Sequence, residues 1–285
     1  MNPSIKYFDI EALGFPCRLA AAEWRPEGAV MGTVVAVHGL SRQKRDFDDL
    51  GKYLSAQGYR FLALDAPGRG GSSWLQSAQE YHLGTYAQVF GAFLIQHVSS
   101  PVHWIGTSMG GLTALVMGMA GMGDLFRSVT FVDVTHRPNP AACARIAKYM
   151  TADLPVFSSV DEYLQVMRSN LPLGQVSDDV WYRYAKHQLV KAPQGYMFHF
   201  DPNIVPMAQK GLSSPIDLTP GLVSLSCPVA LVAGEISDLC AAQEIADFQS
   251  LKPQAPLHRC PGAGHVPALA DEATFLFIQR FLKTA

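Results

Sequence analysis

The chain has no paired-cysteine motif and no excess of basic residues. Its 285 residues include five scattered cysteines, Cys17, Cys143, Cys227, Cys240 and Cys260, with no C-x-x-C spacing of the kind used by zinc knuckles or thioredoxin-like sites. An odd, scattered set does not build a disulfide framework, so we expect reduced thiols and a cytoplasmic protein. The 22 basic residues are outnumbered by 24 acidic ones. This balance argues against nucleic acid as a partner, because phosphate binding needs a positive surface.

Long apolar runs and cofactor motifs are also missing. The first 15 residues carry charged side chains and no apolar run, so we expect no signal peptide. The most apolar helix candidate, 112–120, is far shorter than the ~20 residues that cross a bilayer, so we expect no membrane span. Residues 68–73 begin like a G-x-G-x-x-G dinucleotide motif but end on Ser73 in place of the third glycine. The sequence has no H-E-x-x-H, Walker A or EF-hand pattern either, and we expect no metal and no organic cofactor.

The apolar residues that are present form short, regularly spaced runs. Hydrophobic residues make up 48% of the chain and charged residues 16%, which is enough for a large buried core. Short apolar runs predict strands that are buried on both faces, at 33–37, 60–64, 102–105, 129–132, 229–233 and 257–260. Helical periodicity predicts helices at 47–57, 85–97, 109–120 and 271–282. This alternation predicts an α/β fold, with a mainly parallel sheet and helices on both faces.

Two parts of the sequence depart from this alternation. At the N-terminus, 5–12 and 17–24 predict an antiparallel hairpin. Further along, the strands give way to a run of predicted helices, 140–150, 160–169 and 177–190, and then to an irregular stretch with prolines at 196–214. We interpret this region as a helical cap inserted into one core domain, so that the core is 1–135 and 216–285 and the cap is 136–215. The alternative is a surface appendage with no role at the functional site.

Residues 106–110, with the sequence G-T-S-M-G, carry the main chemical signal. This G-x-S-x-G motif directly follows the predicted strand 102–105 and directly precedes a predicted helix. In such a strand–turn–helix the serine lies on a sharp bend with its hydroxyl exposed, and the helix N-terminus favours negative charge beside it. Glycine is needed on both sides because a Cβ would clash where strand and helix approach. Ser108 is therefore a predicted nucleophile, with an ordinary glycine-rich turn as the alternative.

A serine nucleophile needs a base, and the base needs a carboxylate to orient it. His265 follows the last predicted strand, and Asp238 follows the strand 229–233. All three residues then lie after the carboxyl ends of strands, where open parallel sheets bind their ligands. We predict a catalytic triad of Ser108, Asp238 and His265. Asp133 also ends a strand, and it stays open as a residue that assists or replaces Asp238.

Negative charge on the attacked carbonyl oxygen needs fixed N–H donors. One predicted oxyanion donor is the backbone N–H of Met109, the residue directly after the nucleophile. The other is the N–H of Leu40, in the loop H-G-L-S at 38–41, where Gly39 allows a tight bend. We expect His38 of the same loop to be a buried residue that orients the loop, and not a second base.

Together these segments resemble the α/β-hydrolase superfamily over nearly the whole chain. The matching pieces are the H-G loop 38–41, the run D-A-P-G-R-G-G-S at 65–72, the elbow 106–110 with the additional Gly111, the turn 234–238 and the pair 264–265. The resemblance implies an eight-stranded sheet with a helical lid inserted after the sixth strand. The joint pattern is specific for the fold and the triad, and much less specific for the substrate.

Departures from particular subfamilies narrow the predicted chemistry. Ser108 stands where haloalkane dehalogenases and epoxide hydrolases have Asp and where dienelactone hydrolases have Cys, and Thr107 stands where ring-fission C–C hydrolases commonly have Asn. We therefore predict a serine carboxylesterase whose partner is a small-molecule ester of short to medium acyl chain. One alternative is a C–C bond hydrolase of ring-fission products, or a lactonase, with the same triad. Another is a non-catalytic ligand-binding protein on the same fold. The oligomeric state is not indicated.

Overall fold

An eight-stranded, mostly parallel sheet forms the centre of the computed structural model, which describes residues 2–12, 14–98, 101–150 and 154–285. The strands of this sheet are β1 (Ser4–Ala12), β2 (Phe15–Trp24), β3 (Gly32–Val37), β4 (Tyr59–Leu64), β5 (Val102–Thr107), β6 (Phe126–Val132), β9 (Val229–Gly234) and β10 (Leu257–Cys260). The α-helices are α1 (Asp48–Ala56), α2 (Leu83–His97), α3 (Met109–Met119), α4 (Pro140–Tyr149), α5 (Val160–Asn170), α6 (Asp178–Gln188), α7 (Ile204–Leu212), α8 (Thr219–Ser224), α9 (Ala242–Leu251) and α10 (Glu272–Thr284). Within the described ranges, no helix has both the length and the hydropathy of a membrane span.

The strands lie in the order β1-β2-β4-β3-β5-β6-β9-β10. The pairs β1–β2 and β2–β4 are antiparallel, and every neighbouring pair from β4 to β10 is parallel. The predicted α/β fold, its N-terminal hairpin and its eight-stranded sheet are therefore confirmed. Because the parallel strands share one direction, the loops after β3, β5, β6, β9 and β10 all begin at the same edge of the sheet.

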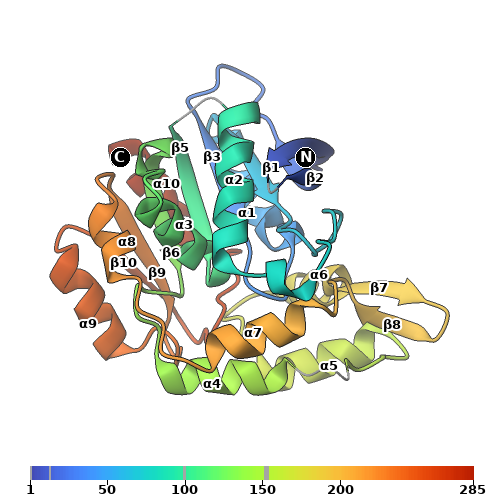
Figure 1. Ribbon diagram of the computed structural model, residues 1–285. Helices are drawn as coiled ribbons and strands as arrows, with labels where there is room; N and C mark the ends of the chain where they lie inside the picture. The colour runs from blue at the N-terminus through green and yellow to red at the C-terminus, as the bar shows by residue number, and fades with distance from the viewer. Residues whose placement is uncertain (1, 13, 99–100, 151–153) are drawn as a thin grey trace.

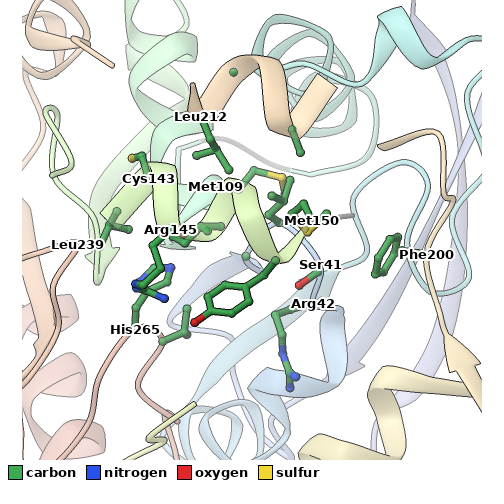
Figure 2. Close-up of a pocket in the computed structure, with 18 of the residues that line it drawn as sticks. Ser41, Arg42, Met109, Cys143, Arg145, Met150, Phe200, Leu212, Leu239 and His265 are labelled. Carbon is green, nitrogen blue, oxygen red and sulfur yellow. The ribbon is translucent and has the colours of Figure 1, made fainter. Parts of the chain in front are cut away.

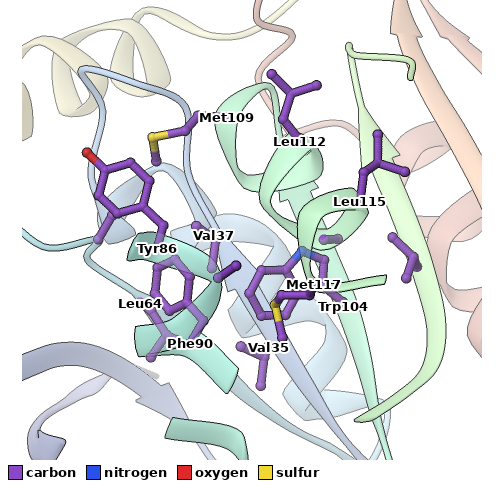
Figure 3. Packing of buried hydrophobic residues seen from close by; sticks show 14 of the residues in the cluster. Val35, Val37, Leu64, Tyr86, Phe90, Trp104, Met109, Leu112, Leu115 and Met117 are labelled. Atoms are coloured by element: carbon purple, nitrogen blue, oxygen red, sulfur yellow. The ribbon is translucent and has the colours of Figure 1, made fainter. Parts of the chain in front are cut away.

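Alternate residues of the central strands are buried in two separate cores. Val35 and Val37 of β3 pack in the core that contains α2 and α3, which Figure 3 shows, whereas Val34 and Ala36 pack in the core that contains α1 and α10. Both faces of the sheet are therefore covered by helices. This is why the strand sequences are apolar throughout and do not alternate with polar residues.

Between β6 and β9 the chain leaves the sheet and passes across its carboxyl edge (Figure 1). We call this stretch the α4–α7 segment (Pro140–Leu212); it contains α4 to α7 and a projecting hairpin of β7 (Leu189–Ala192) and β8 (Gly195–Phe198). Trp181 and Tyr184 belong to a small core of its own that α5 and α6 build.

One expectation for the α4–α7 segment is wrong. The sequence predicts an irregular stretch at 196–214 because of its prolines. The structure instead contains most of β8 and the whole of α7 there. Pro202 precedes α7, and Pro206 lies in its first turn. Backbone N–H groups in a first turn have no acceptor within the helix, so proline loses no hydrogen bond there. A proline in this position starts a helix and does not break one.

Candidate active site

Ser108 lies at a sharp turn between the end of β5 and the start of α3. Its backbone angles are φ 48° and ψ −110°, in a region that residues with a Cβ rarely adopt. The Ser108 N–H donates to the carbonyl of Val132 at 2.9 Å, and its own carbonyl accepts the N–H of Leu112 at 3.0 Å. These bonds to β6 and α3 hold Ser108 in its strained conformation at the positive end of a helix.

The glycines of the elbow are required by space. A Cβ on Gly106 would lie 2.4 Å from the carbonyl carbon of Gly110, and a Cβ on Gly110 would lie 2.2 Å from the carbonyl oxygen of Val37. No side chain tolerates contacts this short, so a larger residue at either position would push β5, α3 and β3 apart. The close approach inferred from the G-x-S-x-G spacing is present in the structure.

A buried carboxylate holds His265. Asp133, the first residue after β6, is fully buried, and its Oδ2 accepts the Nδ1–H of His265 at 2.6 Å. The Gly234 N–H donates to Oδ1 at 2.8 Å, and the Ser237 hydroxyl donates to Oδ2 at 2.7 Å. With Nδ1 donating to the carboxylate, Nε2 of His265 is left with the lone pair that a general base needs.

Asp238, which the sequence favours as the partner of His265, has a different partner. Its carboxylate pairs with Arg145 of α4, at 2.7 Å to Nε and 2.6 Å to Nη2, and 48% of its side chain is exposed. The expectation that Asp238 orients His265 is therefore wrong, and the alternative left open, Asp133, takes that place. The reason is position: Asp238 lies in a surface turn four residues beyond Gly234, the end of β9, where α4 reaches it.

Backbone strain distinguishes the two aspartates, and the sequence pattern does not reveal it. Among the described residues, only two that are not glycine have a positive φ, Ser108 at 48° and Asp133 at 52°. Such conformations persist where the surroundings fix them, and they cluster at functional sites. Aspartate in a left-handed conformation directly after a strand is a signal that only coordinates supply.

His38 holds the loop that follows β3. Its Nε2 accepts the N–H of Ala66 at 3.0 Å, so Nδ1 carries the proton and donates it to the carbonyl of Gly39 at 2.7 Å. Burial lowers the pKa of His38 to about 4, which keeps the ring neutral near pH 7. Both ring nitrogens are occupied. His38 therefore orients the loop and is not available as a base.

The residues Leu40 and Met109, whose backbone N–H groups are predicted as oxyanion donors, lie beside Ser108. Gly39 lies directly against Ser108, because a Cβ on Gly39 would be 3.7 Å from that of Ser108. Leu40, Met109 and Ser108 line the same cavity. Within the described part of the chain, neither N–H has a hydrogen-bond acceptor. Two unpaired donors beside a serine are the arrangement that stabilises a tetrahedral oxyanion.

Ser108 and His265 open into a cavity of about 890 Å³ between the carboxyl edge of the sheet and the α4–α7 segment. Figure 2 shows His265 and Arg145 at one end of this cavity and Phe200 at the other. Its wall is mostly apolar and includes Leu40, Leu112, Met150, Phe157, Tyr163, Phe198 and Phe200. A cavity of this size and lining suits a small organic molecule.

The structure gathers four of the five predicted site residues around this cavity. Ser108, His265, Leu40 and Met109 line it, whereas Asp238 lies outside its wall. Among the described residues, no hydrogen bond joins the Ser108 hydroxyl to His265, which holds Asp133 through Nδ1. In enzymes without substrate this bond is often long, and it shortens when substrate is bound.

Known proteins resemble this chain in sequence and in fold. Residues 34–276 match the family model described as the alpha/beta hydrolase family. The chain is 30% identical, over 94% of each sequence, to a 3-hydroxybutyrate-oligomer hydrolase of Cupriavidus necator. It is 26% identical, over 86% of each sequence, to a 2-(acetamidomethylene)succinate hydrolase of Mesorhizobium japonicum. The crystal structure of an alpha/beta hydrolase from Novosphingobium aromaticivorans has a TM-score of 0.87 at 26% identity, covering 100% of this chain and 99% of that one. The chain therefore belongs to the alpha/beta hydrolase family and is a hydrolase.

Proposed function

We propose that this hydrolase is a serine carboxylesterase for small-molecule esters of short to medium acyl chain. In this proposal Ser108 is the nucleophile, His265 the general base and Asp133 the carboxylate that orients it. The N–H groups of Leu40 and Met109 are the oxyanion donors. The observation that carries the proposal is that His265, held by the buried Asp133, lines the same cavity as a strained serine at a helix N-terminus.

Ester cleavage then takes place in two halves. Ser108 Oγ attacks the ester carbonyl carbon while Nε2 of His265 takes the hydroxyl proton, and the tetrahedral oxyanion accepts the N–H groups of Leu40 and Met109. His265 gives the proton to the leaving alkoxide, and the alcohol departs. Water, activated by the same imidazole, attacks the acyl-enzyme and releases the carboxylic acid. Asp133 stabilises the imidazolium in both halves.

The names of the relatives support hydrolysis of an ester more than they identify the substrate. The Cupriavidus necator relative is named for 3-hydroxybutyrate oligomers, in which ester bonds join the units. The Mesorhizobium japonicum relative is named for a different compound. Membership of the family is therefore compatible with hydrolysis of several kinds of bond, and the carboxylesterase assignment depends on the residues of the site.

We further propose that residues 136–215 act as a cap on a core formed by 1–135 and 216–285. Support comes from the α4–α7 segment, which supplies the wall of the cavity opposite Ser108 and packs around a small core of its own. A cap of this kind restricts the length of acyl chain that fits.

The five cysteines are unpaired, which supports a reducing, cytoplasmic setting.

Substituting the nucleophile tests the proposal. We expect Ser108→Ala to lower kcat on p-nitrophenyl esters at least about a thousandfold, on the scale of triad losses, while the circular dichroism spectrum stays native. A fluorophosphonate probe should label the wild type and leave Ser108→Ala unlabelled. A Ser108→Ala protein with near-full esterase activity would contradict the assignment.

A substrate panel separates the carboxylesterase from its alternatives. It comprises p-nitrophenyl esters from acetate to palmitate, lactones and ring-fission diketones. We expect the highest kcat/KM on short and medium esters. Turnover confined to lactones or diketones would replace the carboxylesterase assignment by one of those activities. A wild-type protein that the fluorophosphonate does not label would instead be a ligand-binding protein.

A further inference from the structure

Arg69 is buried behind the cavity wall, next to both residues that we propose as oxyanion donors. It follows β4 and is fully buried. Its Nε donates to the carbonyl of Leu40 at 2.9 Å, and its Nη2 lies 3.5 Å from the sulfur of Met109. The remaining nitrogen, Nη1, donates to the carbonyl of Pro67 at 2.7 Å and to the hydroxyl of Tyr86 at 2.6 Å. One guanidinium thus connects the loop after β3, the elbow and α2.

This cation has no carboxylate within ion-pair distance among the described residues, although a buried guanidinium usually has one. Two buried carboxylates in the same region have other partners: Asp65 pairs with Lys44 at 2.5 Å, and Asp201 accepts the Tyr81 hydroxyl at 2.5 Å. Arg69 is stabilised by neutral oxygens and by the face of the Tyr86 ring, 4.9 Å from the guanidinium carbon. Among the described residues, the direct contacts of the Arg69 guanidinium are therefore all with neutral groups.

We propose that Arg69 is a positioning residue of the oxyanion hole, whose unpaired charge also stabilises the tetrahedral oxyanion. The inference rests on the proposed function. Arg69 does not line the cavity and touches no substrate, so it acts through Leu40 and Met109. In a site closed to water, a fixed positive charge favours the state in which an anion forms nearby, and it needs no reorganisation at that moment.

The contacts of the loop after β3 show how Arg69 controls geometry. Arg69 holds the carbonyl of Leu40, and Gln188 at the end of α6 donates through Nε2 to the carbonyl of Ser41, the next residue. Two consecutive carbonyls are thus fixed from opposite sides, one from the sheet and one from the α4–α7 segment. The Leu40 N–H belongs to the preceding peptide, whose Gly39 carbonyl accepts His38 Nδ1–H at 2.7 Å; Arg69 and Gln188 fix the backbone on the other side of Leu40 and so limit its rotation. The contact of Nη2 with the Met109 sulfur restrains the side chain of the second proposed donor residue.

Three variants separate this role from a merely structural one. Arg69→Met removes the charge and every hydrogen bond, and Arg69→Lys keeps the charge but cannot reproduce the fork that reaches Leu40 and Met109. Arg60→Met is the matched control, because Arg60 is a partly buried arginine of β4 whose ion pair with Glu23 lies outside the cavity. The assays are kcat and KM on a p-nitrophenyl ester and the rate and final extent of fluorophosphonate labelling. The inhibition constant of a boronic acid, which forms an anionic tetrahedral adduct on Ser108, is measured as well.

We expect Arg69→Met to lower kcat and the labelling rate about 10- to 100-fold, less than the 10²–10³ lost with a direct oxyanion donor. The boronic acid constant should rise by the same factor, while KM changes less than about threefold and the final extent of labelling stays complete. Arg69→Lys should recover part of the loss. Arg60→Met should lower the melting temperature and leave kcat and the boronic acid constant unchanged.

Other outcomes would overturn the inference. One is a folded Arg69→Met protein with wild-type kcat. The other is a fall in kcat that equals the fall in the final extent of labelling, since the variant would then only contain fewer intact sites. If Arg69→Met does not fold, Arg69→Lys decides: a labelling rate equal to the wild type contradicts the role, and a reduced rate at full extent supports it. Failure here would leave the Ser108→Ala result standing, so the two proposals fail separately.

Discussion

The loops after β6 and β9 each place an aspartate near His265, but they hold it in different ways. Asp133, after β6, is fully buried, has a left-handed backbone and accepts hydrogen bonds from Gly234, Ser237 and His265. Asp238, after β9, is about half exposed and pairs with a single cation, Arg145. A position directly after a strand is therefore not enough to bring a carboxylate into contact with His265. Asp133, and not Asp238, accepts the Nδ1–H of His265.

The partners of the two aspartates also determine how much charge each has left to offer. The other donors to Asp133 are neutral groups, so among the described residues no cation competes with His265 for this carboxylate. Partial burial acts to raise the pKa of Asp238, but Arg145 lowers it below its usual value. The Asp238 carboxyl group is therefore ionised, and its charge is already paired with the Arg145 guanidinium. Only Asp133 combines an unmatched charge with a direct bond to His265.

Exchanging each aspartate for asparagine should give the largest difference in kcat between the two positions. We expect Asp133→Asn to lower kcat about 10³- to 10⁴-fold, because an amide facing Nδ1 favours the wrong tautomer of His265 and cannot stabilise the imidazolium. Asparagine tolerates a left-handed backbone, so the fold should survive. Asp238→Asn should change kcat less than about threefold. Steady-state kinetics and circular dichroism on both variants measure the difference.

The opposite result would restore the assignment that the sequence favours. If Asp238→Asn loses as much activity as Asp133→Asn, the two carboxylates act together. If Asp238→Asn alone is inactive, the histidine exchanges its partner during catalysis. Native circular dichroism in both variants is the necessary control for either conclusion.

The fold was predictable because its signals are local. The apolar strand runs, the helical periods between them and the elbow 106–110 each occupy a few consecutive residues. Ser108 and His265 could be identified for the same reason, since each lies in a short motif after a strand. The predicted and observed sheets agree because a parallel sheet covered on both faces needs strands that are apolar on both faces.

The choice of carboxylate could not be predicted, because it depends on contacts between distant parts of the chain. Asp133 and Asp238 both follow strands, and what separates them is Arg145, 93 residues from Asp238 in the sequence. The role that we assign to Arg69 has the same origin. Its motif was visible at 65–72, but its contacts with Leu40 and Met109 form only when three loops meet at the sheet edge.

Buried histidines should make the free energy of unfolding depend on pH. Burial lowers the pKa values of His38 and His103 to about 4, against 6.5 for an unperturbed histidine. Between these values the unfolded chain binds more protons than the folded one, so the free energy of unfolding falls as the pH falls from about 6.5 to 4. Each shift corresponds to a free energy on the order of 3 kcal/mol. We expect urea denaturation to show little dependence above pH 7 and a steep loss of stability below 6.5.

A substitution of His103 tests how much this one histidine contributes to the pH dependence. Its Nδ1 is hydrogen-bonded to the Ser128 hydroxyl inside the sheet, away from the cavity. His103→Gln keeps a polar group at this position but cannot take up a proton, so the slope of stability against pH between 4 and 6.5 should become shallower. A slope identical to that of the wild type would show that burial of His103 does not govern acid stability.

The smallest expected effect concerns the Arg145–Asp238 pair itself. Its side chains are 39% and 48% exposed, and exposed ion pairs contribute about 0–1 kcal/mol because water and salt screen them. A double-mutant cycle with Arg145→Ala and Asp238→Ala, measured by urea unfolding, should give a coupling free energy below about 1 kcal/mol. Arg168–Asp178 is a matched pair, because both arginines lie on helices of the α4–α7 segment. Each guanidinium also lies over an aromatic ring, that of Tyr149 for Arg145 and that of Trp181 for Arg168. A coupling at Arg145–Asp238 well above the one at Arg168–Asp178 would mean that α4 is tied to the loop after β9, and that Asp238 has a structural role in holding the segment over His265.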